Sequence, residues 1–410
     1  MAELKYWVWL ATRKGISVRK LYELLRYYES PEEIYFVRKG AYPKELGIDP
    51  TSLEDNRLSE TYEVLGTCDD KGITILTLGD AAYPARLKNI YDPPIVLYVN
   101  GKLPIIDEEI AVNIVGTRDC SPYGIKVSEQ LGYEITKMGG LIVSGLARGI
   151  DSAAARGAFR AGGRVVGVLG CGIDVVYPAS NERLFWDVKN FGALVSEYPP
   201  GTRPDKGYFP ARNRIMSGLS LGVVVVEAPE RSGALITASR ALEQGRDVFA
   251  VPGNVDARSC RGSNNLLKEG AQPVTGGIDV MENYAARFPE KFKEVLKLYE
   301  LDKGGLEAVT ERELKETGRA KTNAADKSEQ KPIDKEENRA YIDISVNPEE
   351  YSETELSVLK ALEGQTLHVD TIAEKSGQPM SDVLSALTIL EISGAVTQEP
   401  GKRFKANIKV

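Results

Sequence analysis

The chain has 410 residues, of which 42% are hydrophobic and 27% charged, a composition typical of globular proteins, and its length predicts two or three domains. No apolar run is long enough to cross a bilayer and the first residues lack the build of a signal peptide, so we expect a cytoplasmic protein without membrane contact. The four cysteines form no C-x-x-C pair, which argues against a disulfide framework and against a metal site of the zinc type.

The formal net charge is −7, but the charge is unevenly distributed. Residues 111–270 contain 19 Lys or Arg against 15 Asp or Glu, and 14 of those 19 cations are arginine. An anionic ligand responds to the local field, so the net negative charge does not exclude nucleic acid. The single histidine, His368, lies far from this basic region, which excludes a Ser-His-Asp or Cys-His nucleophile there.

Residues 1–66 have a helical pattern and are predicted to form a small domain of their own. Gly15 marks a turn, while Ser30 and Pro31 are residue types that favour the N-cap and first position of a helix. The segment resembles a helix-hairpin-helix or SAM-like module. Such modules either contact a nucleic-acid backbone or serve for packing alone, and we favour packing.

Residues 67–300 are predicted to form an α/β domain with a Rossmann-like, doubly wound parallel sheet. The strands are expected at residues 73–78, 95–99, 112–115, 141–143, 165–169, 194–196, 223–226 and 248–251. Gly or Ser follows the carboxyl end of nearly every strand, and ligands bind at that edge of such sheets. Neither a G-x-G-x-x-G after the first buried strand nor a P-loop is present, so we expect an anion site of another kind and no cofactor.

The segment before residues 223–226 combines aromatic and cationic side chains. Phe209 is followed by Arg212, Asn213 and Arg214. In one interpretation the guanidinium groups bind phosphates and the ring stacks on a base. In the other, Phe209 belongs to the core and the arginines form a solvated helix face. These residues by themselves leave both interpretations open.

The C-terminal part is predicted to contain a charged linker, residues 301–348, and a winged helix, residues 349–410. The third helix of that domain, residues 381–393, contains no Lys or Arg and is therefore a poor reader of the major groove. We favour a protein-docking or accessory role, although Lys402, Arg403 and Lys405 could contact a backbone.

Six ordered motifs then point to one family. They are IVGTRDCSPYG, IVSGLARGIDSAAARGA, GVLGCGIDVVYP, SEYPPGTRPDKGYFPARNRIMSGLSLGVVVVEA, SGALITASRALEQGRDVFAVPG and GSNNLLKEGA. With them the chain resembles the DNA-processing protein A family, also called DprA or Smf. The resemblance implies a homodimeric protein that is no enzyme. It would bind and protect incoming single-stranded DNA and load the RecA recombinase during natural transformation, as part of DNA uptake and recombination.

The resemblance also assigns DNA-binding residues through the family's G-[ST]-R, Ser-Gly-x-Ala-x-Gly-Ile-Asp and K-x-x-F motifs and the R-N-R that follows. They are Gly116, Arg118, Ser144, Arg148, Lys206, Phe209, Arg212, Asn213 and Arg214. We expect Arg118, Lys206 and Phe209 to meet in one crevice at the carboxyl edge of the sheet. For Ser144, helix–strand packing alone is the alternative.

Two other functions were weighed. A nucleotide phosphoribohydrolase of the lysine-decarboxylase-like group would use Arg212 with Glu227 or Glu243, but residues 232–239 lack the second glycine and closing glutamate of its P-G-G-x-G-T-x-x-E pattern. A duplex-DNA regulator acting through the winged helix is disfavoured by its uncharged third helix. For the homodimer, the pair Leu266 and Leu267 is the candidate contact, and burial against the sheet is its alternative.

Overall fold

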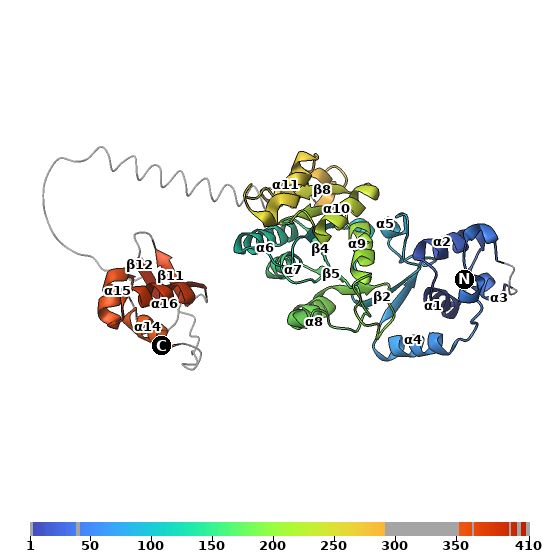
Figure 1. The fold of residues 1–410 in the computed structure, drawn as a ribbon, viewed down its shortest axis with the longest axis horizontal. Coiled ribbons are helices and arrows are strands. Elements are labelled where there is room, and N and C mark those ends of the chain that lie inside the picture. The colour runs from blue at the N-terminus through green and yellow to red at the C-terminus, as the bar shows by residue number, and fades with distance from the viewer. Residues whose placement is uncertain are drawn as a thin grey trace. The chain divides into compact units, whose positions relative to one another are not determined.

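The computed structural model describes residues 3–37, 42–291, 352–362, 365–392, 395–399 and 403–406. Two compact units divide the chain, Met1–Gly318 and Arg319–Val410, and each is described by itself (Figure 1). The linker predicted at residues 301–348 lies outside the described residues. The boundary expected after residue 66 falls inside the first unit.

A nine-stranded sheet with the order β1-β2-β6-β5-β4-β3-β7-β8-β9 organises the first unit. Its strands are β1 Thr74–Thr77, β2 Val96–Gly101, β3 Ile110–Val115, β4 Gly140–Ser144, β5 Val165–Val168, β6 Ala193–Ser196, β7 Gly222–Val225, β8 Asp247–Ala250 and β9 Gln272–Pro273. In the order of the sheet, all neighbours from β6 through β5, β4, β3, β7 and β8 to β9 pair in parallel. The strand β2 pairs antiparallel with both β1 and β6. The predicted doubly wound sheet is confirmed, with the short strand β9 as an addition.

Helices cover both faces of this sheet (Figure 1). They are α5 Ala85–Lys88, α6 Pro122–Lys137, α7 Ile150–Arg160, α8 Glu182–Phe191, α9 Tyr208–Leu219, α10 Gly233–Glu243, α11 Arg261–Lys268 and α12 Gly277–Met281. One core holds apolar side chains of α6, α7, α8 and α12, and the other those of α5, α9 and α10. Successive strand residues point to opposite cores, as Val224 and Val225 do, which explains why β7 reads as a continuous apolar run.

The order of the strands creates a switch point. From β3 the chain builds outward through β4, β5 and β6, and it then returns to place β7 on the other side of β3. The connections after β3 and β7 therefore leave the sheet in opposite directions. At such a point the carboxyl edge of a parallel sheet opens into a crevice that can take a ligand.

The N-terminal helices pack onto the sheet and share its core. They are α1 Leu4–Ala11, α2 Val18–Tyr27, α3 Pro31–Phe36 and α4 Ser59–Asp70. Gly15 has φ +80°, and Ser30 caps α3 with Pro31 in its first turn, as expected. The guanidinium of Arg19 lies 3.7 Å from the ring centre of Tyr91, which ties α2 to the connection between α5 and β2. The helical segment is thus part of one body with the sheet.

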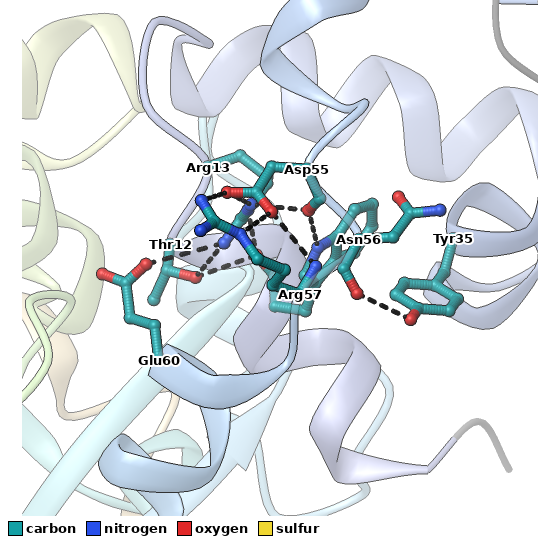
Figure 2. A network of polar contacts seen from close by, with 8 residues as sticks. Thr12, Arg13, Tyr35, Asp55, Asn56, Arg57 and Glu60 are labelled. Atoms are coloured by element: carbon teal, nitrogen blue, oxygen red, sulfur yellow. Dashed lines mark hydrogen bonds and ion pairs between the residues drawn. The ribbon is translucent and has the colours of Figure 1, made fainter.

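A network of ion pairs and hydrogen bonds closes this helical segment (Figure 2). The buried guanidinium of Arg13 donates to the backbone oxygens of Trp9 and Asp55 at 2.9 Å each. Arg57 donates to both carboxylate oxygens of Asp55, and Glu60 lies 3.7 Å from Arg13. Each arginine in this network therefore faces a carboxylate.

The second unit is a winged helix. Its elements are α14 Glu353–Ala361, β10 Leu367–His368, α15 Val369–Ser376, α16 Met380–Ile392, β11 Val396–Glu399 and β12 Arg403–Ala406, with antiparallel strands in the order β10-β12-β11. Ser352 and Glu355 form a capping box at α14, and Gly377 ends α15 with φ +66°. The predicted winged helix is confirmed, while Lys402 lies outside the described residues.

Candidate nucleic-acid interface

The loop after β3 carries Arg118 to the switch point. Gly116 allows this course, because a Cβ there would lie 2.4 Å from a side-chain carbon of Ile150 and 2.8 Å from the backbone oxygen of Glu227. The N–H of Thr117 donates to that same oxygen at 2.7 Å. The loop is thereby held close to α7 and to the end of β7, while the side chain of Arg118 is exposed.

Ser144 ends β4, Arg148 lies in the loop after it, and the two residues differ in placement. Ser144 is fully buried, donates to the backbone oxygen of Asp151 at 3.1 Å and accepts from the N–H of Leu146 at 3.1 Å. It positions the loop and presents no free group to a ligand. Arg148, near the start of α7, is exposed.

Lys206 and Phe209 stand just before and at the start of α9. Lys206 is exposed and Phe209 is half-buried. The Phe209 ring stacks on Tyr177 at 5.4 Å between ring centres, with 24° between the planes, and the guanidinium of Arg118 lies 5.4 Å from the centre of the Phe209 ring. Phe209 is therefore neither a core residue nor a free platform, but part of a stack of two rings and one cation.

Arg212, one helical turn further along α9, lies beneath this stack. It is 5% exposed and donates to the backbone oxygens of Gly145 at 2.8 Å and of Val168. Burial lowers the pKa of its guanidinium. Burial also raises the pKa of the neighbouring Asp151 to about 6, although the charge of Arg212 and the N–H of Gly145 oppose that rise. The two groups form the charged floor of the site.

Asn213 and Arg214 are buried as well. The guanidinium of Arg214 is 3.1 Å from a carboxylate oxygen of Asp92 and 2.6 Å from one of Glu197, and the amide of Asn213 donates to the backbone oxygen of Gly233 at 3.4 Å. The interpretation of the arginines as a solvated helix face is wrong, because both are buried. The expected contact of Arg214 with phosphates stays a prediction, but the two carboxylates engage its Nε and Nη2, and its Nη1 is buried.

Two connected cavities form a crevice along the carboxyl edge. The smaller, of about 230 Å³, has Arg118, Arg148, Tyr177, Phe209 and Arg212 among its lining residues. The larger, of about 680 Å³, shares Arg118, Tyr177, Phe209 and Arg212 with it and adds Lys206 and the start of α10. We call both cavities together the crevice. The expected meeting of Arg118, Lys206 and Phe209 is what the structure has.

The exposed cations of the crevice form no ion pairs among the described residues. Within the described part of the chain, no carboxylate lies within ion-pair distance of Arg118, Arg148 or Lys206. Sequence reasoning missed the second ring, Tyr177. Its signal was an aromatic residue in the glycine-rich connection after β5, the same kind of connection that supplied Arg118 and Arg148.

Two other kinds of feature are absent from the described ranges. No group of three or more His, Cys, Asp or Glu side chains there could hold a metal ion. Likewise, none of the helices in the residues described is long and apolar enough to span a membrane.

Fold and crevice together define a doubly wound α/β protein with a basic, aromatic-lined site at the switch point of its sheet. The family model of the DNA recombination-mediator protein A matches residues 74–285, and the model of the DprA winged helix domain matches residues 345–402. The chain belongs to this family, known as DprA or Smf.

Known relatives extend over most of the chain. It is 32% identical to the protein Smf of Synechocystis over 412 residues, covering 98% of this chain and 99% of the relative. It is 42% identical to the DNA processing protein DprA of Bacillus subtilis, covering 57% and 80%. The X-ray structure of DprA from Streptococcus pneumoniae superposes with a TM-score of 0.61 at 36% identity, covering 69% of this chain and 98% of that one.

Proposed function

We propose that this protein binds single-stranded DNA in the crevice and protects the strand without cleaving it. The observation that carries the proposal is the meeting of exposed, unpaired Arg118, Arg148 and Lys206 with the stacked rings of Tyr177 and Phe209. Cations along a groove bind phosphates of any sequence, and aromatic rings accept any base. Its membership in a family of DNA-processing proteins supports the same conclusion.

The proposed contacts divide by depth. Arg118, Arg148 and Lys206 bind phosphates, while Phe209 and Tyr177 stack on bases. Below them, the remaining predicted residues hold the crevice in shape, and these are Gly116, Ser144, Arg212, Asn213 and Arg214. Tyr177 and Arg118 both contact the Phe209 ring. A base must therefore displace one of them to stack on Phe209, or it must stack on Tyr177 and so extend the stack of rings.

The hydrolase hypothesis finds less support in the geometry. It required Arg212 to act with Glu227 or Glu243. Arg212 donates to two backbone oxygens, Glu227 accepts from Ser121 and Ser259, and Glu243 pairs with Arg240. Neither glutamate is paired with the arginine that the chemistry would need.

Binding of labelled oligothymidine, of a hairpin duplex and of adenosine monophosphate by the full chain tests the proposal. We expect tight binding of the single strand, weaker binding of the duplex and no release of adenine. The variant Arg118→Glu should bind the single strand much more weakly, whereas Arg57→Glu, at an exposed arginine outside the crevice, is the control. Unchanged binding by Arg118→Glu would place the site elsewhere, and released adenine would favour the hydrolase.

We further propose that the bound strand is passed to the RecA recombinase in the cytoplasm during natural transformation. A recombination mediator must help RecA onto strands that a single-strand-binding protein already covers, and the family's description supports that role. RecA-driven strand exchange on covered DNA should start sooner when this protein is added. An unchanged lag with wild-type protein would argue against loading while leaving DNA binding intact.

The homodimer remains a proposal that involves α11 and the edge strand β9. Leu266 packs against the core beside α10, as its alternative predicted, and Leu267 is half-buried. The two-residue β9 leaves an open sheet edge next to them. Light scattering of the full chain at micromolar concentration should give the mass of a dimer, and a monomer there would remove this proposal.

A further inference from the structure

A third cavity, of about 640 Å³, continues the crevice beyond the switch point. It shares Arg231, Ser232, Gly233 and Ile236 with the larger cavity of the crevice, so the two adjoin at these residues. From there it follows the outer face of α10 as far as Glu243. We call this extension the α10 groove.

The charges of the α10 groove change along its length. Glu230 and Arg231 are both exposed at the end next to the crevice, but only Arg231 also lines the crevice, and within the described ranges no carboxylate lies within ion-pair distance of it. Further on, Arg240 and Glu243 pair at 2.8 Å, which leaves that end without net charge. A phosphate would therefore be attracted to Arg231 where it faces the crevice and gain nothing electrostatically at the far end of the groove.

The near end also offers a surface for a base. Ile236 is 43% exposed and lines both the groove and the crevice. The backbone at Gly233 is accessible, because no atom lies within 4 Å of the position that a Cβ would take there. Gly233 begins the eleven-residue helix α10, whose N-terminal dipole favours an anion beside Arg231.

We propose that a bound single strand leaves the crevice across the start of α10, with a phosphate on Arg231 and a base against Ile236, and that the path ends before the Arg240–Glu243 pair. The inference rests on the proposed function and extends it, since it makes the α10 groove a second DNA subsite. The site is then longer than the part of the crevice around Arg118 and Phe209, and oligonucleotides too short to extend beyond that part do not reach Arg231.

An oligothymidine length series on the full chain tests this subsite. Wild-type affinity should rise again once the oligonucleotide is long enough to reach the groove. Arg231→Ala should bind the shortest oligonucleotides as wild type does, lose roughly threefold or more with the long ones, and show a log–log salt slope smaller by about 0.7. Ile236→Ala should weaken the long oligonucleotides without changing that slope.

Arg240→Ala is the matched control, because it removes an exposed arginine of the same helix that is already neutralised. It should bind all lengths as wild type does. All three side chains are exposed, so we expect the three variants to melt at the wild-type temperature. Equal melting temperatures then exclude unfolding as the cause of any loss of binding.

The remaining outcomes separate the two proposals. If Arg231→Ala binds every length normally while Arg118→Glu does not, the groove is no subsite although the crevice still binds DNA. If Arg231→Ala weakens the shortest oligonucleotides equally, Arg231 contacts the same nucleotides as Arg118 and Phe209, and the extension is overturned. If Arg118→Glu also binds normally, the proposed function fails and the extension with it.

Discussion

The arginines of the N-terminal helices and those of the crevice differ in what surrounds them. Arg13 and Arg57 both face Asp55, and Glu60 adds a second carboxylate beside Arg13 (Figure 2). Arg118 and Arg148 face aromatic rings and an open cavity instead. A count of charges in the sequence treats these residues alike. Unpaired cations release counterions from a nucleic acid more readily than paired ones, so we expect pairing, rather than number, to decide where DNA binds.

The same division recurs within the crevice, in depth. Its surface cations are unpaired, whereas Arg212 and Arg214 beneath them face Asp151, Asp92 and Glu197. Buried guanidinium groups need such partners, because a charge without one is expensive to remove from water. Arg212 and Arg214 of α9 thus support the fold, while Phe209 at the start of the helix lines the crevice.

The largest expected effect is on a paired arginine. Arg214→Met removes one partner of a buried cluster and leaves Glu197 buried with its charge unopposed, so we expect a loss of about 3 to 5 kcal/mol in the free energy of unfolding. Urea titration followed by tryptophan fluorescence measures it. The part of the variant protein that stays soluble and folded at low urea should bind DNA with an unchanged log–log salt slope. A loss below about 1 kcal/mol would mean that the pair is not a structural anchor.

The pH dependence of the free energy of unfolding tests the pairing of Asp151 with its buried neighbour Arg212. Its pKa, raised by burial to about 6, exceeds the ordinary value of about 3.9 in an unfolded chain, so the folded state holds a proton that the unfolded state has lost between those values. Stability from this group is present at pH 4 and falls, on the order of 3 kcal/mol, as the pH rises through 6. Asp151→Asn should lack this component. Parallel pH profiles of unfolding for the two proteins would contradict it.

Phe209→Ala separates stacking from charge in the crevice. Loss of a base platform should weaken single-strand binding by about 1 to 3 kcal/mol with little change in salt slope, because a ring releases no counterions. Since Phe209 is half-buried, the melting temperature should fall only slightly. Phe209→Tyr is the control that keeps the ring. Melting far below wild type would instead show that Phe209 is a core residue.

The comparison of the two regions is tested most directly by Arg118→Ala and Lys206→Ala beside Arg57→Ala. Each crevice variant should reduce the log–log salt slope of single-strand binding by about 0.7 and weaken all sequences alike. Arg57→Ala should change neither, because Asp55 already neutralises that exposed arginine. An equal effect of all three variants would mean that pairing does not distinguish the regions.

The smallest effect is expected from removing residues 345–410. The winged helix is a compact unit of its own, and its α16 carries no cation, so single-strand affinity should stay within threefold, a change below about 0.7 kcal/mol. Fluorescence anisotropy with the truncated and full chains measures this. A tenfold loss would show that Arg403 and Lys405 contact the strand.

The sequence alone predicted much of this fold and part of the site. Strand positions followed from apolar runs, because strands buried on both faces tolerate little else. The caps of α3 and α6 followed from Ser30 and Ser121, each before a proline. Arg118, Lys206 and Phe209 could be placed together because connections at the carboxyl edge of a parallel sheet converge.

Tertiary structure alone decided which charges are available. Arg212 and Arg214 stand two residues apart beside exposed Lys206 in the sequence, yet both are buried, because α9 lies against the sheet over that part of its length. Asp92 is remote in sequence from its partner Arg214, and no sequence motif identifies Glu197 as the second partner. Nor does a motif identify Tyr177, which belongs to another connection and stacks on Phe209. Local patterns fix periodicity and caps, whereas charge pairing depends on distances that only the folded chain sets.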